Sequence, residues 1–343
     1  MTNYSVDTCH EVLIRERKPL LTFDETCEYD NWRAKVKEKV MELLGDMPEK
    51  ADLNLRIEWE KEHDIFKEYR ILFNSEENVE VPCHLWVPKA AKKPCPVIIC
   101  LQGHSTGMHI SMGRPIYERD HESIASGDRD FARQIVKEGY AALVLEQRGF
   151  GERKSDKELK FRPDASCTCA HPAMVSMLMG RTLIGERVWD ISRAIDMLES
   201  FPELDMERVA VMGNSGGGTA TYYAACMDER IKIAMPSCSV CSYKYSITAM
   251  RHCPCNYVPG IAKYVDMGEL AALIAPRKLI VVAGEKDHGF LIDGVHEVYD
   301  TIEKIYEKAG AKENCRLVVG PEGHRFYAEQ SWPVFRELSG WKG

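Results

Sequence analysis

The sequence predicts an α/β protein built on a mostly parallel, twisted sheet of about eight strands flanked by helices. From residue 96 onward, short runs of consecutive apolar residues alternate with segments whose apolar residues recur every three or four positions. The runs are typical of strands buried on both faces, and the spaced segments of amphipathic helices. Such alternation favours parallel strands with helices on both sides. We expect two parts: an N-terminal extension over residues 1–60, packed on the core, and a main domain over residues 61–343.

The first quarter of the chain has a different pattern. Residues 30–45 predict an amphipathic helix that ends near Gly45. Apolar and β-branched segments separated by polar turns then predict an antiparallel meander. Its strands are expected at residues 54–60, 66–73 and 79–87. The N-terminal part is therefore a helical and meander extension that leads into the main sheet.

The main domain supplies the parallel strands and their helices. The buried strands are expected at residues 96–101, 141–145, 208–212, 231–235, 278–283 and 316–319. Helices are expected at 131–136 before Gly139, at 184–198, at 216–226, and at 295–305 before Gly310. Two segments lack such periodicity: 151–180 is polar with Pro and Cys, and 239–265 is irregular and aromatic. We expect both to be insertions near the functional site.

Composition narrows the possible partners. The formal net charge is -8 and no block rich in Lys or Arg occurs, so nucleic acid is not an expected partner. No run of about 18 apolar residues is present, so no membrane span is expected. Residues 1–7 lack the features of a signal peptide. We therefore expect a cytoplasmic protein whose thirteen cysteines are reduced.

Three short cysteine pairs raise the question of a metal site: Cys167/Cys169, Cys238/Cys241 and Cys253/Cys255. On paper, the second and third pairs, with the adjacent His252, could supply zinc ligands. Buried or lid thiols are the simpler interpretation, because free cysteine is among the most buried residue types. We expect no metal and no cofactor.

The strongest chemical motif is Gly213-Asn214-Ser215-Gly216-Gly217, between a predicted strand and a predicted helix. A serine at such a sharp turn exposes its hydroxyl at the edge of the sheet, and glycines permit the close approach of strand and helix. The helix N-terminus also favours developing negative charge. We predict Ser215 to be a nucleophile.

A serine nucleophile needs a base and an acid that orients the base. His324, in the loop after the last strand, is the predicted base, ahead of His252, His288 and His296. Asp287 follows the preceding strand and is the predicted acid. Glu285 and Asp293 remain alternatives for the acid.

An oxyanion requires backbone donors. We predict the amides of Gly216 and His104, with Gly103 as the alternative to His104. The His104 side chain is expected either to face substrate or to fill its loop. Gln102, His252 and Tyr257 are predicted substrate-binding residues. Arg148, after the second buried strand, is expected to pair with a carboxylate and tie loops together.

The motifs around Ser215, Asp287 and His324 resemble those of α/β-hydrolases. The similar group contains acetyl xylan esterases, cephalosporin-C deacetylases and dienelactone-hydrolase-like proteins, and the segments 148–153 and 252–260 resemble a bacterial branch of acetyl xylan esterases. The resemblance covers roughly residues 80–340. It implies an α/β-hydrolase fold with Ser215 as nucleophile, Asp287 as acid, His324 as base, and amide donors at His104 and Gly216.

The resemblance and the motifs together predict a serine carboxylic ester hydrolase. Its substrates would be short acyl esters, acetyl esters above all, of small molecules or oligosaccharides. Alternatives are a peptidase-like or C–C bond hydrolase on the same scaffold, or an inactive binding homologue. A homo-oligomer is left open.

Overall fold

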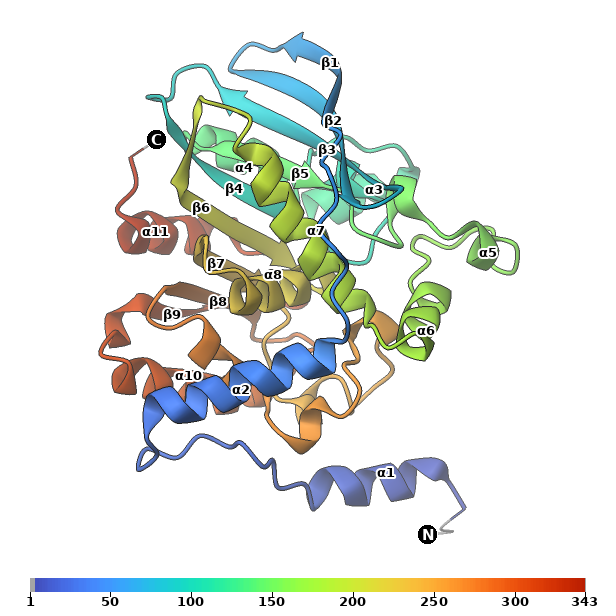
Figure 1. The fold of residues 1–343 in the computed structure, drawn as a ribbon, viewed down its shortest axis with the longest axis vertical. Helices are drawn as coiled ribbons and strands as arrows, with labels where there is room; N and C mark the ends of the chain where they lie inside the picture. Colours follow the sequence, from blue (N-terminus) through green and yellow to red (C-terminus); the bar gives the residue numbers. More distant parts are fainter. Residues whose placement is uncertain (1–3, 343) are drawn as a thin grey trace.

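A computed structural model describes residues 4–342 and contains a nine-stranded mixed sheet, where the sequence predicted about eight strands. The strand order is β1-β2-β3-β5-β4-β6-β7-β8-β9 (Figure 1). Strands β1 to β3 form an antiparallel meander, β3 pairs antiparallel with β5, and the pairs from β5 to β9 are parallel. The strands are β1 (Arg56–Glu62), β2 (Phe66–Glu76), β3 (Val79–Pro88), β4 (Cys95–Leu101), β5 (Ala141–Leu145), β6 (Leu204–Asn214), β7 (Ile231–Ser237), β8 (Lys278–Gly284) and β9 (Cys315–Gly320).

Helices cover both faces of this sheet. They are α1 (Val6–Arg15), α2 (Tyr29–Leu44), α3 (Glu118–Ala125), α4 (Phe131–Lys137), α5 (Asp156–Leu159), α6 (Ala170–Leu178), α7 (Leu183–Leu198), α8 (Gly216–Met227), α9 (Met267–Leu270), α10 (Ile292–Lys308) and α11 (Ala328–Ser339). The predicted helices correspond to α2, α4, α7, α8 and α10. Helices α1, α3, α9 and α11 were not predicted, and neither were α5 and α6 within the segment 151–180.

The alternation of side chains along β4 shows why its sequence is continuously apolar. Val97, Ile99 and Leu101 lie in the core under α7, α8 and α10, whereas Ile98 and Cys100 lie in the core under α4 and α11. Both faces are buried, so each position is apolar. This confirms the predicted α/β class.

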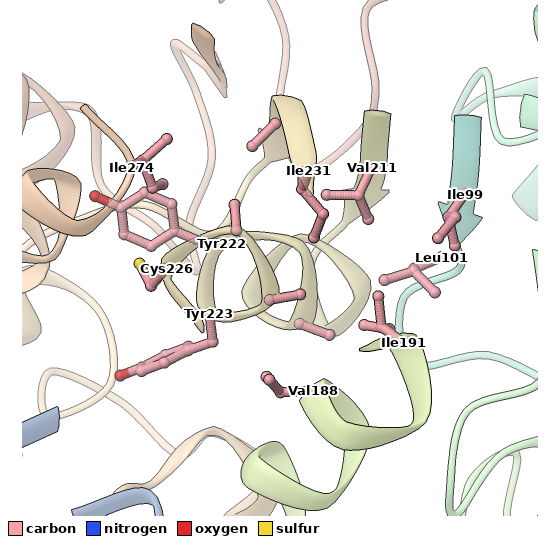
Figure 2. Packing of buried hydrophobic residues seen from close by; sticks show 14 of the residues in the cluster. Ile99, Leu101, Val188, Ile191, Val211, Tyr222, Tyr223, Cys226, Ile231 and Ile274 are labelled. Atoms are coloured by element: carbon pink, nitrogen blue, oxygen red, sulfur yellow. The ribbon is translucent and has the colours of Figure 1, made fainter. Parts of the chain in front are cut away.

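Helix α8, which follows the predicted nucleophile, is buried on nearly all sides. Figure 2 shows it between the sheet and α7. Tyr222 and Tyr223 are almost completely buried, and their hydroxyls are hydrogen bonded to Met267 O and Tyr243 Oη. The labelled neighbours come from the sheet (Ile99, Leu101, Val211 and Ile231), from α7 (Val188 and Ile191) and from the segment after α9 (Ile274). Such packing fixes the start of α8 and therefore the position of Ser215.

The N-terminal extension is anchored by one helix. The apolar face of α2 buries Trp32, Val36, Val40 and Leu44 in the main core, and the helix ends at Gly45 with φ of 88°, as predicted. All residues of α1 remain at least partly exposed. The predicted division between residues 60 and 61 falls inside β1. Among residues 4–342, none of the helices combines the length and the apolar character needed to cross a bilayer.

Candidate active site

Ser215 occupies a strained turn between β6 and α8. Its φ of 57° and ψ of -123° lie in a region that side-chain-bearing residues rarely adopt. The Ser215 amide donates to Ser237 O over 2.8 Å, which anchors the turn to the end of β7. The residue is partly exposed although its neighbours Asn214 and Gly216 are buried. The backbone therefore directs the hydroxyl out of the sheet edge.

The glycine at 217 is required by a backbone contact. A Cβ atom on Gly217 would lie 2.2 Å from Leu101 O and 2.5 Å from Gln102 O. Real Cβ atoms do not approach backbone that closely, so only glycine allows α8 to begin against the end of β4. This is the close approach that the motif predicted.

His324 and Asp287 form a hydrogen-bonded pair. His324 Nδ1 lies 2.8 Å from Asp287 Oδ2, and the Asp287 side chain is completely buried whereas that of His324 is 35% exposed. Asp287 Oδ1 also accepts from the amides of Gly289 (2.8 Å) and Phe290 (3.3 Å). Burial alone would raise the pKa of Asp287, but the hydrogen bond and charge of His324 outweigh it, so the pKa is lowered. Asp287 is therefore a carboxylate at neutral pH.

Apart from His252, which lines the cavity described below, the other candidates for the acid and the base lie on the surface. Glu285, His288, Asp293 and His296 are all exposed, and Asp287 is the carboxylate hydrogen bonded to His324. The structure thus brings together His324 and Asp287 in the relation that the sequence predicted.

Two neighbours of this pair were not predicted. Phe290 stacks on the His324 ring with centroids 5.8 Å apart, which restricts the imidazole. The Cys238 thiol, directly after β7, lies within 4.8 Å of the Asp287 carboxylate, and burial raises the pKa of Cys238 to about 12. The position of Cys238 directly after a buried strand was the available sequence signal, because the ends of parallel strands gather at one edge of a sheet.

Ser215 and His324 line one cavity of about 440 Å³ at this edge. His104, His252 and Phe290 also line it. The His252 ring contacts Phe290 edge-on at 5.1 Å. Within residues 4–342, no hydrogen bond joins Ser215 Oγ to His324; such bonds are often long before substrate binds.

The loop after β4 lies against the start of α8. A Cβ on Gly216 would lie 2.6 Å from Cε1 of His104, so the imidazole covers Gly216, and a Cβ on Gly103 would lie 3.0 Å from that of Ser215. The His104 side chain therefore faces the cavity. The roles of the Gly216 and His104 amides as oxyanion donors stay predictions.

Two of the three predicted substrate-binding residues do not line this cavity. Gln102 is buried, and its Nε2 donates to Glu146 Oε1 over 2.7 Å. The Tyr257 hydroxyl donates to Ile247 O over 3.0 Å, and the residue lines a separate cavity of about 630 Å³ between α1 and the segment 243–263. Gln102 and Tyr257 therefore lie away from this cavity, whereas His252 lines it; the substrate-binding roles of all three stay predictions.

Glu146 is a buried acid behind the site, directly after β5. It accepts from the amide of Met108 (3.1 Å) and from Gln102 Nε2 (2.7 Å). Burial raises the pKa of Glu146 to about 7, although the Met108 and Glu152 amides and the Arg153 charge oppose the shift. Glu146 is therefore a group whose ionisation affects stability near neutral pH.

We expect Glu146→Gln to remove a pH-dependent loss of stability. Between the ordinary pKa of 4.5 and about 7, the folded protein binds more protons at this site than the unfolded chain, so stability falls as pH rises. The variant should gain, relative to the wild type, on the order of 3 kcal/mol in unfolding free energy between pH 5 and pH 8. Urea unfolding at both pH values measures this difference. Exposed Glu77 supplies the control Glu77→Gln; a difference between Glu146→Gln and wild type that stays constant with pH would contradict the expectation.

Arg148 lies at the centre of a buried ion-pair network next to the candidate site. Its guanidinium donates to Asp190 (2.8 and 2.9 Å) and to Glu76 (2.7 Å), and Arg153 donates to Asp190 (2.6 Å). The network connects the loop after β5 to α7 and β2. The expected pairing of Arg148 with a carboxylate is confirmed.

The cysteine pairs are distributed differently from the predicted grouping. Cys238 donates to Arg325 O and Cys241 to Leu291 O, away from the pair Cys253/Cys255. Instead, Cys169 lies with Cys253 and Cys255 beside His104.

Comparisons with known proteins agree with this architecture. A family model described as acetyl xylan esterase (AXE1) matches residues 30–266. The Bacillus subtilis (strain 168) protein named "Putative hydrolase YtaP" is 26% identical over 315 residues, which cover 90% of this chain and 99% of that protein.

Solved structures share the fold at low sequence identity. A putative acetyl xylan esterase from Bacteroides fragilis NCTC 9343 has a TM-score of 0.80 with 16% identity, covering 98% of this chain and 96% of its own. A glucuronoyl esterase from Solibacter usitatus has a TM-score of 0.72 with 18% identity, covering 95% and 98%. An acetyl xylan esterase from Paenibacillus sp. R4 has a TM-score of 0.57 with 17% identity, covering 96% and 99%. The predicted α/β-hydrolase fold is confirmed.

Proposed function

Because the chain belongs to the acetyl xylan esterase (AXE1) family and is a carboxylic ester hydrolase, we propose that it removes acetyl groups from carbohydrates through Ser215, His324 and Asp287. One observation carries this proposal: Ser215, in its strained conformation, and His324 line the same cavity. The ring of His324 is in turn hydrogen bonded to the buried Asp287. A nucleophile, a base and an orienting acid are the parts that acyl transfer needs.

In the proposed first step, Ser215 Oγ attacks the ester carbonyl and its proton passes to Nε2 of His324. Asp287 holds Nδ1–H and stabilises the imidazolium. The amides of Gly216 and His104 would bind the oxyanion. When the tetrahedral intermediate collapses, the C–O bond to the alcohol breaks and Nε2 returns the proton to that alcohol. Water then repeats the sequence on the acetyl-enzyme, and acetate leaves.

The substrate part of the proposal rests on the family. A short acyl group would lie near Ser215, with Phe290 and His252 as walls, while the sugar would extend along the segments 151–180 and 239–265. The proposed location is the cytoplasm, and the proposed partner is an ester of a small molecule or an oligosaccharide.

A substrate panel tests this proposal. We expect acetate release from acetylated xylo-oligosaccharides, and kcat/KM for p-nitrophenyl esters that falls from acetate to octanoate. A methyl ester of glucuronic acid is included because structural relatives are named glucuronoyl esterases. Preferred cleavage of that ester, of peptides or of C–C bonded substrates would replace the acetyl-ester proposal, and inactivity on every substrate would favour a binding protein.

A further inference from the structure

Three segments distant in sequence place one histidine and three cysteines together beside the active-site cavity. His104 follows β4, Cys169 belongs to the segment 151–180, and Cys253 and Cys255 to the segment 239–265. Their ligand atoms all lie within 4.8 Å of one another. His104 Nε2 is 3.1 Å from Cys255 Sγ, which is 3.3 Å from Cys253 Sγ.

The charge of a neighbouring arginine points to thiolates in this cluster. Arg187 is 1% exposed, and among residues 4–342 no Asp or Glu forms an ion pair with it. Its Nη2 donates to Arg148 O (2.7 Å) and to Cys169 Sγ (3.1 Å), and its guanidinium stacks on Phe150 at 4.5 Å. An arginine is always charged and is rarely buried without an anion. A deprotonated cysteine is the anion that the surroundings offer.

We propose that His104, Cys169, Cys253 and Cys255 bind one zinc ion. Three cysteines and one histidine form a common zinc ligand set, and Zn–S bonds of about 2.3 Å in a tetrahedron place the sulfurs about 3.8 Å apart. Cys253 Sγ and Cys255 Sγ lie 3.3 Å apart, and none of the four ligand atoms is more than 4.8 Å from another, so small shifts would give this geometry. On binding, the three thiols release three protons to solvent, with no change of oxidation state.

The charges balance at the proposed site. Three thiolates and Zn²⁺ carry a net charge of minus one, which the buried guanidinium of Arg187 neutralises. Cys167 does not belong to the group of ligand atoms that lie within 4.8 Å of one another and therefore lies outside the proposed ligand set.

A closed set of four protein ligands is typical of structural zinc. The ion would link the loop after β4 to the segments 151–180 and 239–265, which line the cavity. It would also fix the His104 ring over Gly216. This proposal replaces two expectations from the sequence: that the cysteines are thiols only, and that Cys238/Cys241 would complete any metal site. It does not depend on the proposed reaction.

Metal analysis of the full-length, tag-free protein tests the inference. We expect one zinc per chain by plasma mass spectrometry after purification under reducing conditions, or after incubation with zinc chloride and removal of free metal. Replacement by Co²⁺ should give thiolate-to-cobalt charge-transfer absorption. All thirteen thiols should titrate after denaturation with a chelator. A wild-type chain that takes up no zinc, or that titrates two thiols fewer because Cys253 and Cys255 form a disulfide, would overturn the proposal.

Paired variants locate the ion. Loss of a group that hydrogen bonds to a metal ligand typically lowers metal affinity by about 10-fold to 100-fold. Cys253→Ser/Cys255→Ser removes two ligands themselves, so it should lower zinc affinity by at least this much. The control Cys27→Ser/Cys226→Ser changes one partly buried and one buried cysteine elsewhere and should retain the metal. Equal zinc in both variants would reject this site. If the first variant does not fold, the metal content and cobalt spectrum of the wild type still decide.

Discussion

Ser215→Ala should abolish ester turnover while the protein stays folded. Loss of the nucleophile in a Ser-His-Asp enzyme lowers kcat by about 10⁵- to 10⁶-fold, because the base then has no proton to accept and no acyl-enzyme forms. Stability should change little, because alanine also has a Cβ atom. The backbone φ of 57° at position 215 should therefore cost about as much with alanine as with serine. Rates on p-nitrophenyl acetate and thermal unfolding measure the two effects.

A fluorophosphonate probe gives an independent reading of the same residue. Attack by Ser215 Oγ on phosphorus expels fluoride and labels wild type, but should not label Ser215→Ala. The matched control is Ser239→Ala, because Ser239 is buried and its hydroxyl has no partner among residues 4–342. It should keep both the rate and the label. If Ser215→Ala retained turnover and labelling, Ser215 would not be the nucleophile.

The three residues predicted as nucleophile, acid and base share one property: each lies at or just after the end of a strand. Parallel strands end at the same edge, so Ser215 after β6, Asp287 after β8 and His324 after β9 gather there. The nucleophile motif can also be recognised from a few neighbouring residues, and the acid and the base follow it in a fixed chain order. The sequence alone therefore indicates the fold class and the candidates for the triad.

Where the sequence did not suffice, the missing information is tertiary. The segments 151–180 and 239–265 have no periodicity, so nothing local indicates that Cys169 meets Cys253 and Cys255. Gln102 follows β4 and Glu146 follows the adjacent β5, and the side chain of Gln102 donates to that of Glu146. The sequence places both residues after strands, but it does not show that Gln102 turns toward Glu146 and away from the cavity.

The helices that were missed also have physical reasons. Helix α11 contains Pro333, which is unfavourable inside a helix, yet Trp332 and Phe335 bury against the sheet. Tertiary burial outweighs the local penalty there. Helix α3 is short and largely charged, so its pattern gives little apolar signal.

Asp287→Asn should lower kcat by about 10⁴-fold with the fold intact. The asparagine oxygen can still accept from the amides of Gly289 and Phe290, which leaves the NH₂ group facing Nδ1 of His324. Two donors cannot share that contact, so the imidazole must place its proton on Nε2, where it cannot accept the proton of Ser215. The loss should appear in kcat rather than in unfolding temperature.

Its controls are the two other acids that the sequence left open. Glu285→Gln and Asp293→Asn remove a charge from exposed positions near the same strand end, without contact to His324. They should keep kcat within a few-fold of wild type, because exposed charges act weakly through water. If kcat fell strongly in Glu285→Gln or in Asp293→Asn while Asp287→Asn stayed active, the altered surface residue would be the acid. The reason is that the reaction depends on the carboxylate that orients His324.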